Sequence, residues 1–304
     1  MFDLRYHVAS LAAVFLALAV GILLGVAISG KLSTAEESLS AAQIDDLNRR
    51  LAAASTRADA ADRRREAAED LVEEAYPVLI QNRLADRHFA LLFVGPVQGE
   101  VSSAVEQTLD DAGASTPRLV ALDAPIDGDG LDDALRRNDT LAAYADDDGD
   151  FGELGEALGR ELAEEGETPL WTALSSELVQ ERSGSPFPAV DGAIIAYSWE
   201  GPPTDQVEET REVRSTTTLV EGLLRGLDDT GSAVVGVETS NSARSRIDVY
   251  RREGISTVDD IDTLAGRLAL AVVLAGGQEG HYGVKDSASD GVAPPIEPLP
   301  ESSG

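Results

Sequence analysis

A long apolar run opens the chain, from Val8 to Ile28, and it contains no charged residue. As an α-helix this run rises about 30 Å, which matches the hydrocarbon thickness of a bilayer. A cleavable export signal usually has a shorter apolar stretch of about 7–15 residues. The run therefore predicts a retained, single-pass membrane anchor, with a signal cleaved near Ala27 as the alternative. Arg5 and the free amino terminus favour a cytosolic short end, which places the rest of the chain outside.

Apolar or small residues then recur at alternating steps of three and four between residues 31 and 84. These positions are Ile44, Leu47, Leu51, Ala54, Ala58, Ala61, Ala68, Val72, Ala75 and Leu79. With charged residues on either side, this spacing predicts a coiled-coil stalk, and one long helix folded back on the globular domain is the alternative. Helical structure should break near Pro77. Gly21 and Gly25 have the spacing that lets two membrane helices approach closely, so we expect a parallel homodimer.

From His88 onward, continuous apolar runs alternate with helical stretches. The runs read as strands buried on both faces, at His88–Gly95, Arg118–Ala124, Gly192–Ser198 and Ser232–Glu238. Helices are expected at Glu100–Ala112, Phe151–Glu165, Trp171–Arg182, Thr216–Leu227 and Asp262–Ala275. This alternation predicts a mostly parallel, doubly wound, Rossmann-like α/β domain.

The pattern divides the chain into four segments. We expect an anchor over 1–30, a helical stalk over 31–84, the α/β domain over 85–284, and a tail over 285–304. The composition of the tail, rich in Pro, Ser and Gly, predicts disorder.

Charge and sulfur content narrow the function classes. The formal net charge is -31, from 55 acidic and 24 basic residues, so the outer surface should repel nucleic acid. Such acidity is typical of proteins that stay hydrated in concentrated salt, and cation capture is the alternative. The chain has no cysteine and one methionine, which excludes disulfides, thiolate metal sites and a cysteine nucleophile.

Phosphate and calcium motifs are poor matches in this sequence. The stretch Gly95–Ala104 carries glycines before a helix, but Glu100 follows Gly99 where a phosphate loop needs lysine, so we expect an ordinary strand-to-helix turn. Two acidic stretches, Asp123–Asp133 and Asp146–Asp150, fail the EF-hand pattern and are expected to be solvated loops. Asp262 or Thr263 suits the N-cap of the last helix, and we expect this region to be a structural join of strand and helix.

Catalytic and metal-binding signals are also weak. The three histidines, His7, His88 and His281, lack a nearby G-x-S-x-G elbow, which Arg182–Pro186 resembles only superficially. We expect no enzymatic activity and assign no catalytic or cofactor-binding residue. Copper(I) prefers sulfur ligands, which this chain almost entirely lacks. Copper(II) can bind imidazole, and His281 beside Tyr282 is the one external candidate for it. We favour the interpretation that His281 is an ordinary loop residue.

Three stretches resemble a known family. The opening LRYHVASLAAVFLALAVGILLG is similar to the start of the actinobacterial MctB family, the mycobacterial copper transport protein B family. The stretches GISTVDDIDTLAGRLALA (Gly254–Ala271) and GHYG (Gly280–Gly283) resemble later parts of that family, so the resemblance covers nearly the whole chain.

The resemblance implies an envelope protein of copper efflux or copper homeostasis, described for mycobacteria as an outer-membrane channel. It supplies no ligand residues, and copper is a possible bound metal only by resemblance. The continuous apolar runs do not match a spanning β-barrel, which needs repeated segments of about ten residues that alternate apolar and polar positions. A second hypothesis is a non-catalytic scaffold that presents its acidic α/β domain to another envelope protein.

Overall fold

A computed structural model of the chain describes residues 4–28, 34–184, 189–199, 201, 210–242 and 244–297. The chain divides into two compact units, Met1–Glu69 and Asp70–Gly304. The second unit is a mixed α/β fold.

The first unit holds helix α1 (Leu4–Ile28) and most of helix α2 (Thr34–Ile80). Large apolar side chains of α1 are exposed at Leu11, Val14, Phe15, Leu16, Leu18, Val20, Ile22 and Leu23. Within the part of the chain that the structure describes, no helix has both the length and the apolar content of a membrane span. The single span predicted over Val8–Ile28 therefore has no support from the structure. The predicted coiled coil and homodimer stay predictions.

Helix α2 continues past Pro77, which corrects the expected break at that residue. Proline removes one backbone donor and crowds the preceding turn, so a helix crossing it needs compensation from packing. Tyr76 and Ile80 are buried in the α/β unit together with Leu84, and the Tyr76 hydroxyl donates to Asp111 Oδ2 at 3.2 Å. Burial of this apolar face holds the last turn of α2 on the second unit.

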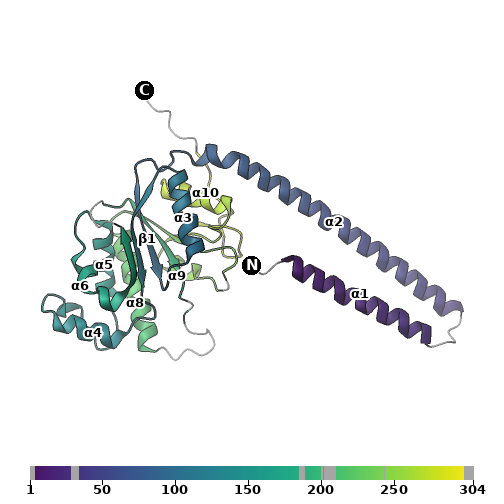
Figure 1. Cartoon of the computed structure of the whole chain (residues 1–304), viewed down its shortest axis with the longest axis horizontal. Helices are drawn as coiled ribbons and strands as arrows, with labels where there is room; N and C mark the ends of the chain where they lie inside the picture. Colours follow the sequence, from purple (N-terminus) through teal and green to yellow (C-terminus); the bar gives the residue numbers. More distant parts are fainter. Residues whose placement is uncertain are drawn as a thin grey trace, which may run out of the picture. The chain divides into compact units, whose positions relative to one another are not determined.

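A seven-stranded sheet forms the centre of the second unit (Figure 1). Its strands are β1 (His88–Val94), β2 (Ser115–Leu122), β3 (Val179–Gly184), β4 (Gly192–Tyr197), β5 (Ala233–Val237), β6 (Ser256–Val258) and β7 (His281–Tyr282). The order across the sheet is β3-β2-β1-β4-β5-β6-β7. All neighbours are parallel except β2 and β3. The predicted mostly parallel, doubly wound sheet is confirmed.

Two hydrophobic cores cover the two faces of this sheet. Ala90, Leu92 and Val94 of β1 face one core, and the alternate residues Phe89, Leu91 and Phe93 face the other. Helices α4 (Gly128–Arg137), α5 (Gly152–Ala163), α6 (Pro169–Ala173), α7 (Ser175–Leu178), α8 (Arg211–Asp228) and α9 (Ile247–Arg252) contribute to the first core. Helices α3 (Gly99–Asp111) and α10 (Leu264–Leu274) contribute to the second, with the end of α2, and Figure 1 shows α3 and α10 on the opposite side of the sheet from α5 and α8.

Several predicted elements need correction. The helix expected over Trp171–Arg182 is instead α6, α7 and then strand β3, whose polar residues pair only with β2 at the sheet edge. The acidic stretch Asp123–Asp133, expected to be a loop, contains the start of α4, because Asp127 caps that helix by accepting from the Gly130 N–H at 3.1 Å. The short 3₁₀ helix Ala142–Tyr144 follows α4.

Glycines set the distance between α5 and α8. A Cβ added at Gly155 or Gly159 would collide with the backbone carbonyls of Leu219 and Leu223. In the same way, a Cβ added at Gly222 or Gly226 of α8 would collide with backbone carbonyls of α5. These two helices therefore pack backbone to backbone, closer than helices with side chains at the interface can approach.

We predict that Gly155→Ala lowers the free energy of unfolding by about 2 kcal/mol, because overpacking a close helix contact outweighs the better helix propensity of alanine. Urea unfolding followed by tryptophan emission measures the change. Gly99→Ala is the matched control, since Gly99 begins a helix and nothing lies within 4 Å of its added Cβ. Equal unfolding midpoints for the two variants would contradict the close packing.

Candidate functional site

The carboxyl ends of β1, β4 and β5 meet at one edge of the sheet. From β1 the chain proceeds to β2 on one side, and β4 then lies on the other side of β1. In open α/β sheets a crevice forms at such a reversal of strand order, and ligands bind there. The residues that directly follow these strands are therefore the first place to look for a site.

The ends of β1 and β4 are tied together by one carbonyl oxygen. The Val94 oxygen accepts hydrogen bonds from the backbone N–H of Ser198 at 3.0 Å and of Trp199 at 2.9 Å. Gly95 follows with a φ of 102°, and a Cβ there would lie 2.8 Å from the Trp199 nitrogen. The positive φ and the close approach both favour glycine.

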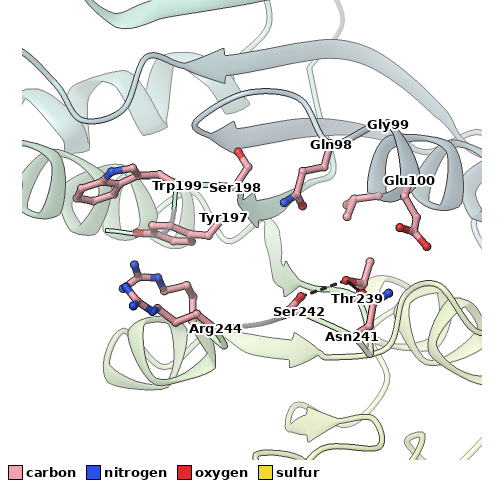
Figure 2. Close-up of a pocket in the computed structure, with 12 residues that line it drawn as sticks. Gln98, Gly99, Glu100, Tyr197, Ser198, Trp199, Thr239, Asn241, Ser242 and Arg244 are labelled. Atoms are coloured by element: carbon pink, nitrogen blue, oxygen red, sulfur yellow. Dashed lines mark hydrogen bonds between the residues drawn. The ribbon is translucent and has the colours of Figure 1, made fainter. Parts of the chain in front are cut away.

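A pocket of about 330 Å³ lies at this edge, and we call it the strand-end pocket. Figure 2 shows the residues after β1 and β4 on one side of it and those after β5 on the other. Its lining is polar and aromatic, and consists of Gln98, Gly99, Glu100, Val101, Tyr197, Ser198, Trp199, Thr239, Asn241, Ser242, Arg244 and Arg246. These groups can donate and accept hydrogen bonds and supply positive charge, which suits recognition of a small polar molecule.

Contacts behind the lining hold it in place. The Tyr197 ring packs edge-on against Tyr250, with centroids 5.7 Å apart, and the Tyr250 hydroxyl donates to the Ile195 oxygen at 2.9 Å. Burial raises the pKa of Tyr197 well above its usual value, so its hydroxyl stays neutral at physiological pH. The Thr239 hydroxyl donates to Asn241 Oδ1 at 2.9 Å and lies 3.1 Å from the Ser242 hydroxyl (Figure 2).

A second polar cluster lies after β6 and joins the C-terminal segment to the sheet. Buried Asp259 accepts from the backbone N–H of Val284 at 2.8 Å through Oδ1 and from the Ser287 hydroxyl at 3.0 Å through Oδ2. Gly283, with a φ of 138°, lies so close that an added Cβ would collide with the Asp259 carboxylate. Only glycine fits at this position.

The start of the expected disordered tail is part of this cluster. Lys285 Nζ lies 2.7 Å from Glu238 Oε1 in a largely buried ion pair. Glu238 Oε2 accepts from the backbone N–H of Arg246 at 3.1 Å. Residues 285–290 are therefore held by specific contacts, which corrects the disorder expected from 285. The polar composition that suggested disorder instead supplies partners for buried carboxylates.

A family model described as "Copper transport outer membrane protein, MctB" matches residues 1–293. The chain belongs to the MctB family. No curated protein shows significant similarity to it.

The structure brings together the two later stretches that carry the MctB resemblance. Strands β6 and β7 pair at Thr257 with His281 and at Val258 with Tyr282. Asp259 of the first stretch then binds the chain just after Gly283 of the second. Thr263 is the N-cap of α10 and accepts from the Gly266 N–H at 3.0 Å, so the expected strand-to-helix join is confirmed.

The other sequence candidates lie apart from the strand-end pocket, except the glycine stretch. Gly99 and Glu100 line it, as part of the turn from β1 into α3. Asp146 accepts from the backbone N–H of Asp148 and Asp150 at 2.9 and 3.0 Å, so Asp146–Asp150 forms a turn, as expected.

The histidines and the Arg182 segment are placed elsewhere. His281 Nδ1 lies 3.0 Å from the Thr257 hydroxyl, and burial lowers its pKa. His88 begins β1, and the side chain of His7 lies outside the described residues. Arg182 belongs to β3, and residues 185 and 186 are outside the described part. Among the described residues, no group of three His, Cys, Asp or Glu side chains is placed to hold a metal ion.

The residues that line the pocket from β4 and β5 were missed at the sequence level. The first set, YSW, covers the last two residues of the predicted strand Gly192–Ser198 and the residue after it. The second set, TSNS, directly follows the predicted strand that ends at Glu238. Polar and aromatic residues at the ends of consecutive buried strands were the available signal. These residues form one site only if their strands are neighbours in the sheet, and the order of the strands is not given by the local sequence.

Asp260 is fully buried beside this cluster and gives a test by pH. Burial raises its pKa from 3.8 to about 6, although Oδ2 accepts from the Thr263 hydroxyl at 2.9 Å. The folded state therefore binds a proton that the unfolded state has released between these two pKa values. Stability from this group is present at low pH and is lost as the pH rises through about 6.

We predict that the free energy of unfolding of the wild type falls by about 1 kcal/mol between pH 5 and pH 7 because of Asp260. In the Asp260→Asn chain this decrease should be absent. Urea unfolding at both pH values measures it. Exposed Asp148→Asn makes the same charge change and should keep the wild-type pH dependence. The same pH dependence in the Asp260→Asn chain and the wild type would show that Asp260 does not titrate in this range.

Proposed function

We propose that this chain is a membrane-attached envelope protein of copper transport and homeostasis, and that its α/β unit acts by binding and not by catalysis. Membership of the MctB family across residues 1–293 carries the copper assignment. Copper is the cargo in this proposal, and we assign no copper ligands. The lining of the strand-end pocket supports a binding role, because its hydroxyl, amide and guanidinium groups are typical of ligand recognition.

Attachment to lipid through α1 is supported by its exposed apolar side chains. Phe15 is 63% exposed and Leu16 is 70% exposed, and their neighbours along the helix are similar. The spacing of these residues distributes them around most of the helix surface, whereas a helix packed on a protein core usually has one apolar stripe. Contact with hydrocarbon would remove this surface from water.

We predict that loss of this chain makes its source organism more sensitive to copper and raises its cell copper content. Complementation with the full chain should restore both. Leu16→Asp should fail to complement, because a charge in an apolar helix weakens its transfer to hydrocarbon by about 3 kcal/mol, or on the order of 100-fold. Growth across a copper series, metal analysis of cells and flotation of the chain with lipid vesicles measure these effects.

The control is Leu71→Asp, since Leu71 of α2 is 66% exposed, lies outside the apolar helix and is not one of the predicted coiled-coil positions. This variant should float with vesicles and complement like the wild type. A zinc series tests whether the effect is specific for copper. Unchanged copper tolerance and copper content in the deletion strain would refute the copper role. Flotation of the Leu16→Asp chain equal to that of the wild type would refute attachment through α1.

A further inference from the structure

We propose that the strand-end pocket binds a small hydroxylated carboxylate of the sugar-acid type. This inference goes beyond the copper role and does not depend on it. The pocket volume of about 330 Å³ lies at the lower end of the range for ligand sites, roughly 300–1,000 Å³. A ligand the size of one sugar ring fits that space better than a dinucleotide.

The neutral polar side chains of the pocket match a ligand that carries several hydroxyl groups. Gln98, Asn241 and Ser242 carry groups that can donate and accept, and they come from loops on both sides of the opening (Figure 2). The Ser198 hydroxyl donates to the Val94 oxygen at 3.2 Å, so it adds an acceptor. A hydroxyl group needs partners of both kinds, because it donates one hydrogen bond and accepts others. The bond between Thr239 and Asn241 fixes part of this surface before a ligand arrives.

The charges of the pocket favour a carboxylate. Arg244 lies at one end of the lining in Figure 2, and Arg246 also lines the pocket, in a chain with a net charge of -31. Arg244 Nη1 also donates to the Gly201 oxygen at 3.4 Å. A guanidinium group binds a carboxylate through paired, charge-assisted hydrogen bonds. Glu100 lies at the other end, in the first turn of α3. Its charge offsets the attraction of that helix terminus for a phosphate dianion, so a ligand with one negative charge is favoured.

Trp199 adds an apolar wall and a reporter. Its side chain is partly exposed at the pocket, and the flat indole suits the apolar face of a sugar ring. The other tryptophan of the chain, Trp171, is buried in the core and donates through Nε1 to the Leu158 oxygen. A ligand in the pocket should therefore change the emission of Trp199 and leave that of Trp171 unchanged.

The test is a titration of the full chain, in detergent micelles, with glucuronate, and it follows both tryptophan emission and heat of binding. We expect saturable binding with a dissociation constant on the order of 1 mM, as a ligand of this size permits. Glucose and glucose 6-phosphate should bind at least about 10-fold more weakly, since the first lacks the charge and the second carries a dianion. Tighter binding of glucose 6-phosphate would overturn the carboxylate assignment.

Variants locate the binding site. Arg244→Gln should weaken glucuronate binding about 10-fold, whereas Arg137→Gln, an exposed arginine of α4 outside the pocket, should leave it unchanged. Asn241→Ala is a second variant at an exposed position, in case Arg244→Gln impairs folding. Trp199→Phe should abolish the emission change while calorimetry still detects binding. Absence of saturable binding by both methods, or equal affinity in the Arg244→Gln, Asn241→Ala and Arg137→Gln chains, would overturn the proposal.

Discussion

Burial of strand β1 on both faces is the constraint on which the α/β unit depends. After His88, every residue of β1 is apolar and buried. Such a strand must be covered from two sides, so the sheet can only be stable between two layers of helices. One layer is built around the glycine contact of α5 and α8. The other contains α3, α10 and the end of α2, whose Tyr76 and Ile80 belong to the same core. Helix α2 therefore continues past Pro77 because its last turn packs into the core that covers this face of the sheet.

The same arrangement explains where polar chemistry gathers. Parallel strands end at one edge, and the residues after β1, β4 and β5 form the strand-end pocket there. After β6 the chain instead places Asp259 under its own C-terminal segment, where the carboxylate receives backbone and hydroxyl donors. Hydrogen bonds of this kind are what make a buried carboxylate tolerable, and neighbouring Asp260, with one oxygen lacking a partner among the described residues, shows the opposite case in its raised pKa.

Much of the fold was predictable from the sequence, because strands buried on both faces leave long apolar runs. The runs that became β1, β2, β4 and β5 are of this kind. Local chemistry also limited the N-cap of α10 to Asp262 or Thr263, and the structure shows Thr263. Strand β3 was not readable, because its exposed polar residues form a strand only through pairing with β2. Strand β6 has three residues and is too short for a periodic signal. The pocket residues Trp199 and Arg244 were missed for a related reason, since they become neighbours only when the order of the strands is known.

Hydrogen exchange of the full chain tests the central burial claim most directly. The account predicts that the amides of Phe89–Val94 exchange at the slowest rates of the molecule, because they lie in the middle of the sheet under two cores. It also predicts protection of the Val284 amide through its bond to Asp259, above that of exposed turn residues such as Asp147. Exchange of the β1 amides as fast as that of Asp147 would contradict the doubly covered sheet and the site that it positions.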